Sequence, residues 1–310
     1  MGINIENTMR KYNLRPAKAL GQNFLVNQGI LRDIVKAAEL TEEDTVLEIG
    51  PGLGNLTAEL AERAGLVVAI EIDKRLLPIL KENLKDYENI RIINADILQI
   101  DPAKELAGIG GCSSGKGDGS LGKGGIAEGD GSLGKGDGSP ACLKIVANLP
   151  YYITTPVIMK LLESGVKAKT MVFMVQKEVA DRMRAAPGGK DYGALSVAVQ
   201  YYSKPEIIME VPPNSFIPAP EVCSSVIRLE LYDEPPVNIR SEELFFKLVK
   251  AAFGQRRKTL VNAINNAGYF GLGKEEIKEI LDKAGIGEKQ RGETLSLEQF
   301  ALLSNLIYKN

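Results

Sequence analysis

A regular alternation of short apolar segments with helical segments between residues 28 and 175 restricts the possible folds more than any other property of this sequence. Strands are expected at 45–50, 66–72, 90–94, 144–148 and 170–175, and helices at 28–40, 55–63, 74–85 and 154–164. Because these strands are apolar almost throughout, both faces of their sheet must be covered, which is typical of a parallel α/β sheet. Two later strands, expected at 195–202 and 224–231, are preceded only by a short helix at 177–184, which predicts an antiparallel edge.

The C-terminal part of the chain is predicted to form a separate helical domain. The composition changes at Asp233-Glu-Pro-Pro236, a sequence typical of a domain junction. Beyond it the apolar spacing is helical at 242–253, 258–265, 274–284 and 297–308, and a capping box at Ser296–Gln299 begins the last helix. We therefore expect a first domain at 1–232, with a basic arm at 1–27, and a second domain at 233–310.

One segment interrupts the alternation. Residues 108–140 are rich in Gly, Ser, Asp and Lys, and the sequence at 117–124 recurs at 129–136. With almost nothing to bury, this segment is predicted to be a flexible surface insertion, and it lacks the spacing of a phosphate-binding loop. Cys112 and Cys142 bracket the insertion, but no disulfide is expected in a reducing compartment.

Composition excludes several kinds of chemistry and location. The chain has three cysteines and no histidine, which rules out a disulfide framework, His-based triads, His-ligated zinc and imidazole acid–base catalysis. No metal site is expected. No apolar run approaches the ~18 residues of a membrane span, and basic residues interrupt residues 1–20 where a secretory signal would be apolar. We expect a cytoplasmic protein.

Two basic stretches occur in a chain whose net charge is only −2. Residues 8–32 contain five basic residues and no acidic one, and residues 244–274 contain six and again no acid. Such stretches are typical of a phosphate-facing surface, but solvated faces with acidic partners nearby in the fold explain them equally well on charge alone. The candidate phosphate contacts are Arg10, Lys11, Arg15, Lys18, Arg256, Arg257 and Lys258.

A glycine-rich turn follows the first predicted strand and precedes a helix. Gly50, Gly52 and Gly54 allow the backbone to pass close to a ligand, and the helix N-terminus offers free N–H groups. The dinucleotide fingerprint would need its third glycine where Asn55 stands. A pyrophosphate site is therefore disfavoured.

Acidic residues end the next two predicted strands. Glu71 stands nineteen residues after Gly52, where a carboxylate can accept hydrogen bonds from both ribose hydroxyls. Asp96 can accept from an adenine amino group, with Ile72 and Ile97 as apolar plates for the ring. One such carboxylate alone commonly caps a neighbouring helix, but this succession favours an adenosine pocket without phosphates.

The fourth predicted strand ends in Asn148-Leu-Pro-Tyr151, a turn suited to activating an aromatic amine. Such an amine is a poor nucleophile because its lone pair is delocalised into the ring. The Asn148 side-chain oxygen and the Leu149 carbonyl can hold both amine hydrogens and direct the lone pair toward an electrophile. Pro150 fixes the carbonyl direction, and Tyr151 offers a face on which an extruded base can stack. No strong base is needed, because the proton leaves after the new bond forms.

Taken together, these residues resemble the rRNA adenine N6,N6-dimethyltransferases of the kasugamycin-resistance type. The similarity covers nearly the whole chain. Its motifs are Leu20-Gly-Gln-Asn-Phe-Leu25, Glu48–Gly54, Glu71, Asp96, Asn148–Ile153, Gln176–Val179, Tyr192–Ser196, Pro213–Val222 and Phe253–Leu260. The insertion at 108–140 departs from the family pattern without interrupting any of these motifs.

The resemblance implies a Rossmann-like class I S-adenosylmethionine-dependent methyltransferase with a small helical C-terminal domain that binds rRNA. The cofactor pocket would be lined by Asn23, Leu25, Gly50, Glu71, Asp96 and Asn148. Tyr151 and Phe216 would hold the target adenine between them. The family methylates two adjacent adenines in the loop of the 3′-terminal hairpin of small-subunit rRNA, giving each two methyl groups and releasing S-adenosylhomocysteine. The expected partner is the immature small ribosomal subunit, and the protein itself is expected to be a monomer.

Three alternatives stay open at this point. The related large-subunit enzyme that confers macrolide resistance would share the fold and the pocket, although Leu149 and the Phe253–Lys258 run favour the small-subunit interpretation. A non-catalytic assembly factor could hold the immature subunit through the basic stretches. A dehydrogenase is disfavoured by the glycine spacing.

Overall fold

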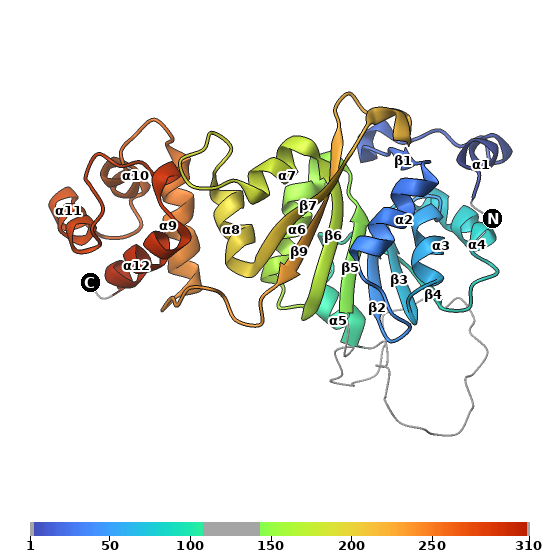
Figure 1. Cartoon of the computed structure of the whole chain (residues 1–310), viewed down its shortest axis with the longest axis horizontal. Helices are drawn as coiled ribbons and strands as arrows, with labels where there is room; N and C mark the ends of the chain where they lie inside the picture. The colour runs from blue at the N-terminus through green and yellow to red at the C-terminus, as the bar shows by residue number, and fades with distance from the viewer. Residues whose placement is uncertain (1–2, 108–142, 309–310) are drawn as a thin grey trace, which may run out of the picture. The chain divides into compact units, whose positions relative to one another are not determined.

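The computed structural model describes residues 3–107 and 143–308 (Figure 1). The predicted insertion at 108–140, together with Cys112 and Cys142, lies outside the described residues. The chain divides into two compact units. The first comprises Met1–Ala180 and Glu206–Leu231, and the second comprises Asp181–Pro205 and Tyr232–Asn310. Every helix within residues 3–107 and 143–308 is too short or too polar to span a bilayer.

The described residues form one large α/β sheet and one small strand pair. The strands are β1 (Phe24–Leu25), β2 (Thr45–Ile49), β3 (Leu66–Glu71), β4 (Ile90–Asn94), β5 (Leu143–Asn148), β6 (Ala168–Gln176), β7 (Ser203–Val211), β8 (Phe216–Ile217) and β9 (Ser224–Leu231). The large sheet has the order β4-β3-β2-β5-β6-β9-β7. Strands β2 to β6 are parallel neighbours, whereas β9 is antiparallel to β6, which confirms the predicted parallel sheet and its antiparallel edge.

The strand order places a crevice in the middle of the sheet. From β2 the chain proceeds outward to β3 and β4, then returns to the other side of β2 as β5. The connections after β2 and β5 therefore leave in opposite directions, and a crevice opens at their carboxyl ends. In open α/β sheets ligands bind at this point.

Helices cover the sheet because its strands are apolar on both faces. The helices of the first unit and of the stretch that follows it are α1 (Ile5–Lys11), α2 (Gln28–Ala37), α3 (Asn55–Ala61), α4 (Leu77–Asn83), α5 (Pro102–Ala107), α6 (Thr154–Glu163) and α7 (Lys177–Arg184). Figure 1 shows α2 and α3 across one face, where Leu31, Ile34 and Leu60 pack on Val46 and Val146. Burial of each such side chain contributes about 1.5–3 kcal/mol.

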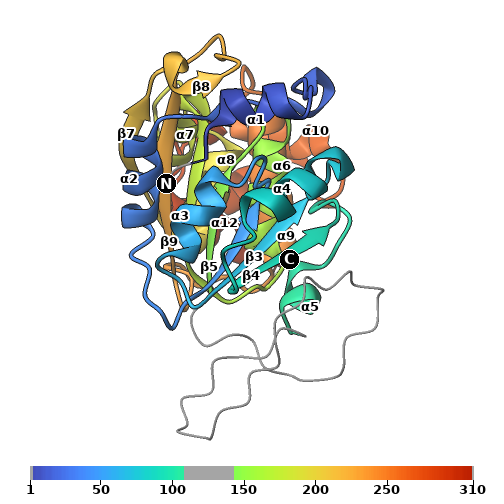
Figure 2. The same ribbon diagram turned by 90° about the vertical axis from the view of Figure 1, so that its right-hand side faces the viewer.

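Residues 3–27 of the N-terminal arm belong to the first unit. Helix α1 begins at the cap Asn4, whose side chain accepts a hydrogen bond from the Asn7 N–H at 2.9 Å. Strand β1 pairs antiparallel with β8. Ile5 and Phe24 are buried against Leu53 and Leu80. Both views place α1 and the β1–β8 pair at the end of the sheet away from α5 (Figures 1 and 2).

One secondary-structure prediction is wrong. Residues 195–202, predicted as a strand, belong to helix α8 (Ala194–Tyr202), and the strand follows as β7. The β-branched and aromatic residues of this segment favour a strand locally, but Val197 and Tyr201 pack in a helical core beside Phe245. Ser196 Oγ accepts a hydrogen bond from the Gly193 N–H at 3.0 Å and so caps the helix start. Tertiary packing has overridden local propensity.

The second unit is helical, and its hydrophobic core explains which residues belong to it. Besides α8 it contains α9 (Glu242–Gly254), α10 (Leu260–Ala267), α11 (Lys274–Lys283) and α12 (Leu297–Tyr308). The sequence prediction drew a single junction at 232/233, whereas this unit also takes in Asp181–Pro205, because Tyr192, Val197 and Tyr201 complete its core. The predicted capping box is confirmed: the Ser296 N–H donates to Gln299 Oε1 at 3.0 Å, and the Gln299 N–H donates to Ser296 Oγ at 3.3 Å.

Candidate active site

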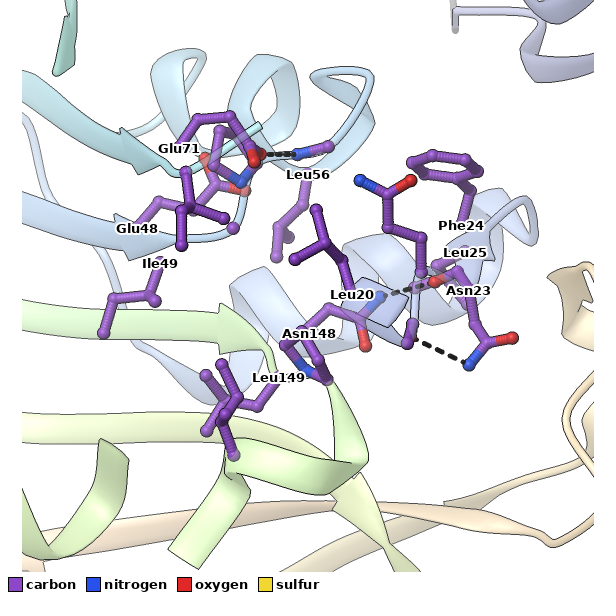
Figure 3. A pocket seen from close by; sticks show the side chains of 18 of the residues that line it. Leu20, Asn23, Phe24, Leu25, Glu48, Ile49, Leu56, Glu71, Asn148 and Leu149 are labelled. Atoms are coloured by element: carbon purple, nitrogen blue, oxygen red, sulfur yellow. Dashed lines mark hydrogen bonds between the residues drawn. The ribbon is translucent and has the colours of Figure 1, made fainter. Parts of the chain in front are cut away.

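A cavity of about 260 Å³ lies at the carboxyl ends of β2, β3 and β5, within the first unit (Figure 3). Every residue that the sequence analysis assigned to cofactor or catalysis lines it: Asn23, Leu25, Gly50, Glu71, Asp96, Asn148, Leu149, Pro150, Tyr151 and Phe216. They come from the arm, the glycine turn, three strand ends and β8. The fold therefore brings these residues together, and their individual roles stay predictions.

The glycine turn lines the cavity. Gly50 has a φ of +70°, and a Cβ there would meet nothing within 4 Å, so its missing side chain leaves the space open. Gly52, at φ +60°, could carry no Cβ without pressing on the Phe24 ring at 3.2 Å. The first glycine gives room to a ligand, and the second lets the arm approach the turn.

Glu71 is a buried and fixed acceptor at the end of β3. Its side chain accepts hydrogen bonds from the Gly52 N–H at 3.2 Å and the Asp73 N–H at 2.8 Å. Burial raises the pKa of its carboxyl, and these two backbone donors partly offset that rise. Each carboxylate oxygen keeps a second lone pair for a ligand hydroxyl.

The predicted adenine site lies at the end of β4. Asp96 Oδ1 accepts a hydrogen bond from the Leu98 N–H at 2.9 Å, so this carboxylate both caps a turn and lines the cavity. Ile97 is buried, whereas Ile72 is 48% exposed although it lines the same cavity. An exposed isoleucine at a cavity wall is suited to cover the face of an aromatic ring.

The turn after β5 presents one side-chain acceptor and one backbone acceptor. Asn148 Nδ2 donates to the Asn23 carbonyl at 3.2 Å, so the nitrogen end of this amide faces Asn23 and Oδ1 is its other end (Figure 3). The Leu149 N–H donates to the Met174 carbonyl at 3.2 Å and anchors the turn to β6. Within residues 3–107 and 143–308, nothing donates a hydrogen bond to Asn148 Oδ1 or to the Leu149 carbonyl. Both acceptors are therefore available to a ligand.

Two aromatic side chains accompany this turn. The Tyr151 hydroxyl shares a hydrogen bond of 2.7 Å with Ser224 Oγ, and burial raises the pKa of Tyr151. Phe216 is 3% exposed and pairs with Leu25 in the two-stranded sheet. The Ser224 contact fixes one edge of the Tyr151 ring.

Residues 13–309 match the family described as ribosomal RNA adenine dimethylase. The chain belongs to this family. A relative from Alkaliphilus metalliredigens (strain QYMF), named ribosomal RNA small subunit methyltransferase A, is 49% identical over 299 residues, with 96% of this chain and 94% of the relative covered. A relative of the same name from Clostridioides difficile (strain 630) is 48% identical, with 96% of this chain and 93% of the relative covered.

Solved structures agree with this family. A dimethyladenosine transferase from Plasmodium falciparum has a TM-score of 0.69 at 25% identity, covering 90% of this chain and 95% of that one. The 23S rRNA methyltransferase ErmE has a TM-score of 0.64 at 26% identity, covering 92% of this chain and 100% of the ErmE chain. This adenine dimethylase is thus a class I S-adenosylmethionine-dependent rRNA methyltransferase.

The cavity of the dimethylase fits its cofactor. Glu71 offers acceptors for ribose hydroxyls, and the open space at Gly50 admits a chain of atoms close to the backbone. Two residues that line the cavity, Glu48 and Asn55, each have a buried side-chain oxygen (Oε2 and Oδ1) without a hydrogen-bond partner within the described residues. A ligand that brings hydroxyl donors and an ammonium group would satisfy such a set.

Sequence reasoning assigned no role to several lining residues. Glu48 is 1% exposed, and burial raises its pKa to about 8, with the nearby charge of Glu71 adding to the rise. Gln22 and Phe24 come from the arm, and the Asn55 side chain donates to the Ile3 carbonyl at 3.1 Å. Glu48 belongs to the Glu48–Gly54 motif of the family resemblance, but its sequence neighbours do not indicate the direction of its carboxyl group.

The predicted phosphate contacts differ in their surroundings. Lys11 pairs with Glu82 at 3.3 Å, and Arg256 lies 3.5 Å from Glu293, so nearby acids partly balance these two. Arg10, Arg15, Arg257 and Lys258 are exposed and make no ion pair with another described residue. The Lys18 side chain lies outside what the structure describes. Among the described residues no cluster of His, Cys, Asp and Glu could hold a metal ion.

Proposed function

We propose that this enzyme dimethylates N6 of two adjacent adenines in the loop of the 3′-terminal hairpin of small-subunit rRNA, during biogenesis of that subunit. The observation that carries the proposal is the pair of available acceptors, Asn148 Oδ1 and the Leu149 carbonyl, beside a pocket with the chemistry of an adenosine site. Relatives at 48–49% identity named ribosomal RNA small subunit methyltransferase A support the small-subunit target.

The cofactor would be held by strand ends and the arm. Glu71 would accept from the ribose hydroxyls and Asp96 from the adenine amine, while Asn23, Leu25 and Gly50 would line the remainder. When bound, S-adenosylmethionine supplies a methyl group on a positively charged sulfur, and S-adenosylhomocysteine is the product. No protein nucleophile is required.

The turn at Asn148 would activate the target amine. Asn148 Oδ1 and the Leu149 carbonyl would hold both N–H hydrogens out of the plane of the adenine ring. The nitrogen lone pair would then no longer be delocalised into the ring and would occupy the fourth tetrahedral direction, open to the methyl donor. Pro150 keeps the carbonyl in place, with a φ of −57°. Tyr151 and Phe216 would stack on the flipped base and exclude water. Together these contacts give the alignment that a direct displacement needs.

The first methylation leaves one hydrogen on the nitrogen. The proton lost from nitrogen passes to solvent once the N–C bond has formed, so the lack of histidine is no obstacle. In the second transfer only one acceptor holds a hydrogen, and the other faces the methyl group already present.

Binding of the ribosomal substrate would use positive charge. Arg10, Lys11, Arg15 and Lys18 in the arm, and Arg256, Arg257 and Lys258 after α9, are the proposed phosphate contacts. The helical part at 233–310 would bind rRNA while 1–232 carries the chemistry, and the enzyme would act as a cytoplasmic monomer.

The test is methylation of purified subunits. The protein is incubated with labelled S-adenosylmethionine and immature small subunits lacking these methyl groups, and in parallel with unmodified large subunits, because ErmE shares the fold. We expect N6,N6-dimethyladenosine, detected by mass spectrometry, in the 3′-terminal hairpin alone. Label on the large subunit would refute the substrate, and no label with intact cofactor binding would favour a non-catalytic assembly role.

A further inference from the structure

The side chain of Gln22 bridges two segments that are 51 residues apart in the chain. Its Oε1 accepts a hydrogen bond from the Ala17 N–H at 2.8 Å, within the arm. Its Nε2 donates to Asp73 Oδ2 at 3.0 Å, just beyond β3. Since both ends of one amide are used, the side chain has a single favourable orientation.

Asp73 connects this bridge to the predicted ribose site. Its carboxylate receives the Arg75 guanidinium at 2.9 and 2.7 Å, and this pairing lowers the pKa of Asp73. The Asp73 backbone N–H donates to Glu71 Oε1 at 2.8 Å. The position of Asp73 therefore helps to set the direction of the Glu71 carboxylate.

The next residue of the arm connects the bridge to the predicted catalytic turn. The Asn23 carbonyl accepts from Asn148 Nδ2 at 3.2 Å and so decides which end of that amide faces the amine site. An amide turned by 180° would offer N–H donors where the chemistry requires an acceptor. Gln22 fixes the backbone immediately before this carbonyl.

We infer that Gln22 is a positioning residue that fastens the arm across the cavity and so orients Glu71 and Asn148 together. The inference rests on the proposed function for the roles of those two residues. Gln22 itself touches neither the ribose acceptor nor the amine acceptor in the structure; it acts through Asp73 on one side and Asn23 on the other.

The test is a double-mutant cycle that reverses the polarity of the Gln22–Asp73 hydrogen bond. Gln22→Glu places a carboxylate against the Asp73 carboxylate. Asp73→Asn leaves one side-chain oxygen where two accept from Gln22 and Arg75, and it removes the negative charge paired with Arg75. In the double variant, the carboxylate introduced at position 22 accepts from the amide introduced at position 73 while still accepting from the Ala17 N–H. We expect each single change to raise the KM for S-adenosylmethionine about tenfold, the scale of a charged hydrogen bond. The double variant should have a KM clearly below that of the worse single variant, because it regains the hydrogen bond between positions 22 and 73 although the pairing of Asp73 with Arg75 stays lost.

Several readouts separate positioning from loss of fold. Initial rates give KM and kcat for each variant on immature small subunits, and thermal melting checks folding. Gln28→Glu adds the same charge at the first residue of α2, and Gln28 makes no side-chain hydrogen bond with any described residue, so we expect wild-type constants.

The outcomes are distinct. Single variants with wild-type constants, or a double variant no better than the worse single one, would overturn the inference. If the wild-type enzyme fails to methylate rRNA, the proposed function fails, and calorimetric binding of S-adenosylmethionine to the four proteins still tests the Gln22–Asp73 coupling.

Discussion

Replacement of Asn148 by alanine separates chemistry from cofactor binding. The change removes one of the two acceptors that would hold the target amine, while the Leu149 carbonyl and its anchor to Met174 at 3.2 Å remain. Loss of one preorganised hydrogen-bonding group at a reacting centre typically costs about 10²- to 10³-fold in kcat. The cofactor loses at most one hydrogen bond, so its dissociation constant should rise less than about tenfold.

The assay is single-turnover methylation of immature small subunits, paired with calorimetric titration of S-adenosylmethionine. Asn238→Ala is a matched control, because Asn238 is exposed in the second unit and only its backbone carbonyl takes part in a hydrogen bond among the described residues. A methylation rate for Asn148→Ala within about threefold of this control, well short of the loss expected for a preorganised group, would refute the role of the Asn148 amide. A dissociation constant raised as much as the rate is lowered would assign Asn148 to cofactor binding alone.

Three further predictions concern the cofactor, pH and RNA. Glu71→Ala should raise the dissociation constant of S-adenosylmethionine about 10- to 100-fold, since hydrogen bonds to a charged acceptor contribute about 1.5–3 kcal/mol; an unchanged calorimetric value would contradict the ribose assignment. Glu48 has a folded-state pKa of about 8 against an unfolded value of 4.5, so its contribution to stability is present below pH 4.5 and is lost as the pH rises to 8. The melting temperature should therefore fall from about pH 5 to about pH 8 more steeply in the wild type than in Glu48→Gln, and parallel curves would disprove this linkage. Replacement of Arg257 and Lys258 by alanine should reduce the slope of log affinity for rRNA against log salt by about 0.7–0.9 per lost contact, and a filter-binding slope equal to that of the wild type would exclude them.

Short-range pattern was enough to predict the parallel part of the sheet and the residues that meet at its edge. Glu71, Asp96 and Asn148 follow successive parallel strands, and the carboxyl ends of such strands converge on one edge of the sheet, so the order of the motifs already brings these residues together. The glycine turn could be predicted for the same reason, because the positive φ at Gly50 is a local property that favours glycine.

Closure of the site by the arm, in contrast, depends on contacts between distant parts of the chain. The hydrogen bonds from Gln22 to Asp73 and from Asn148 to Asn23 join residues 51 and 125 positions apart, and no local pattern encodes such partners. The same holds for α8, whose residues favour a strand locally but become helical because the core around Phe245 buries them. Glu48 lies in a readable motif, but its burial and raised pKa depend on neighbours that the fold supplies. The sequence pattern determines the strands and the glycine turn, because these depend on short-range geometry. Packing between distant segments determines the orientation of the Gln22 and Asn148 side chains and the burial and pKa of Glu48.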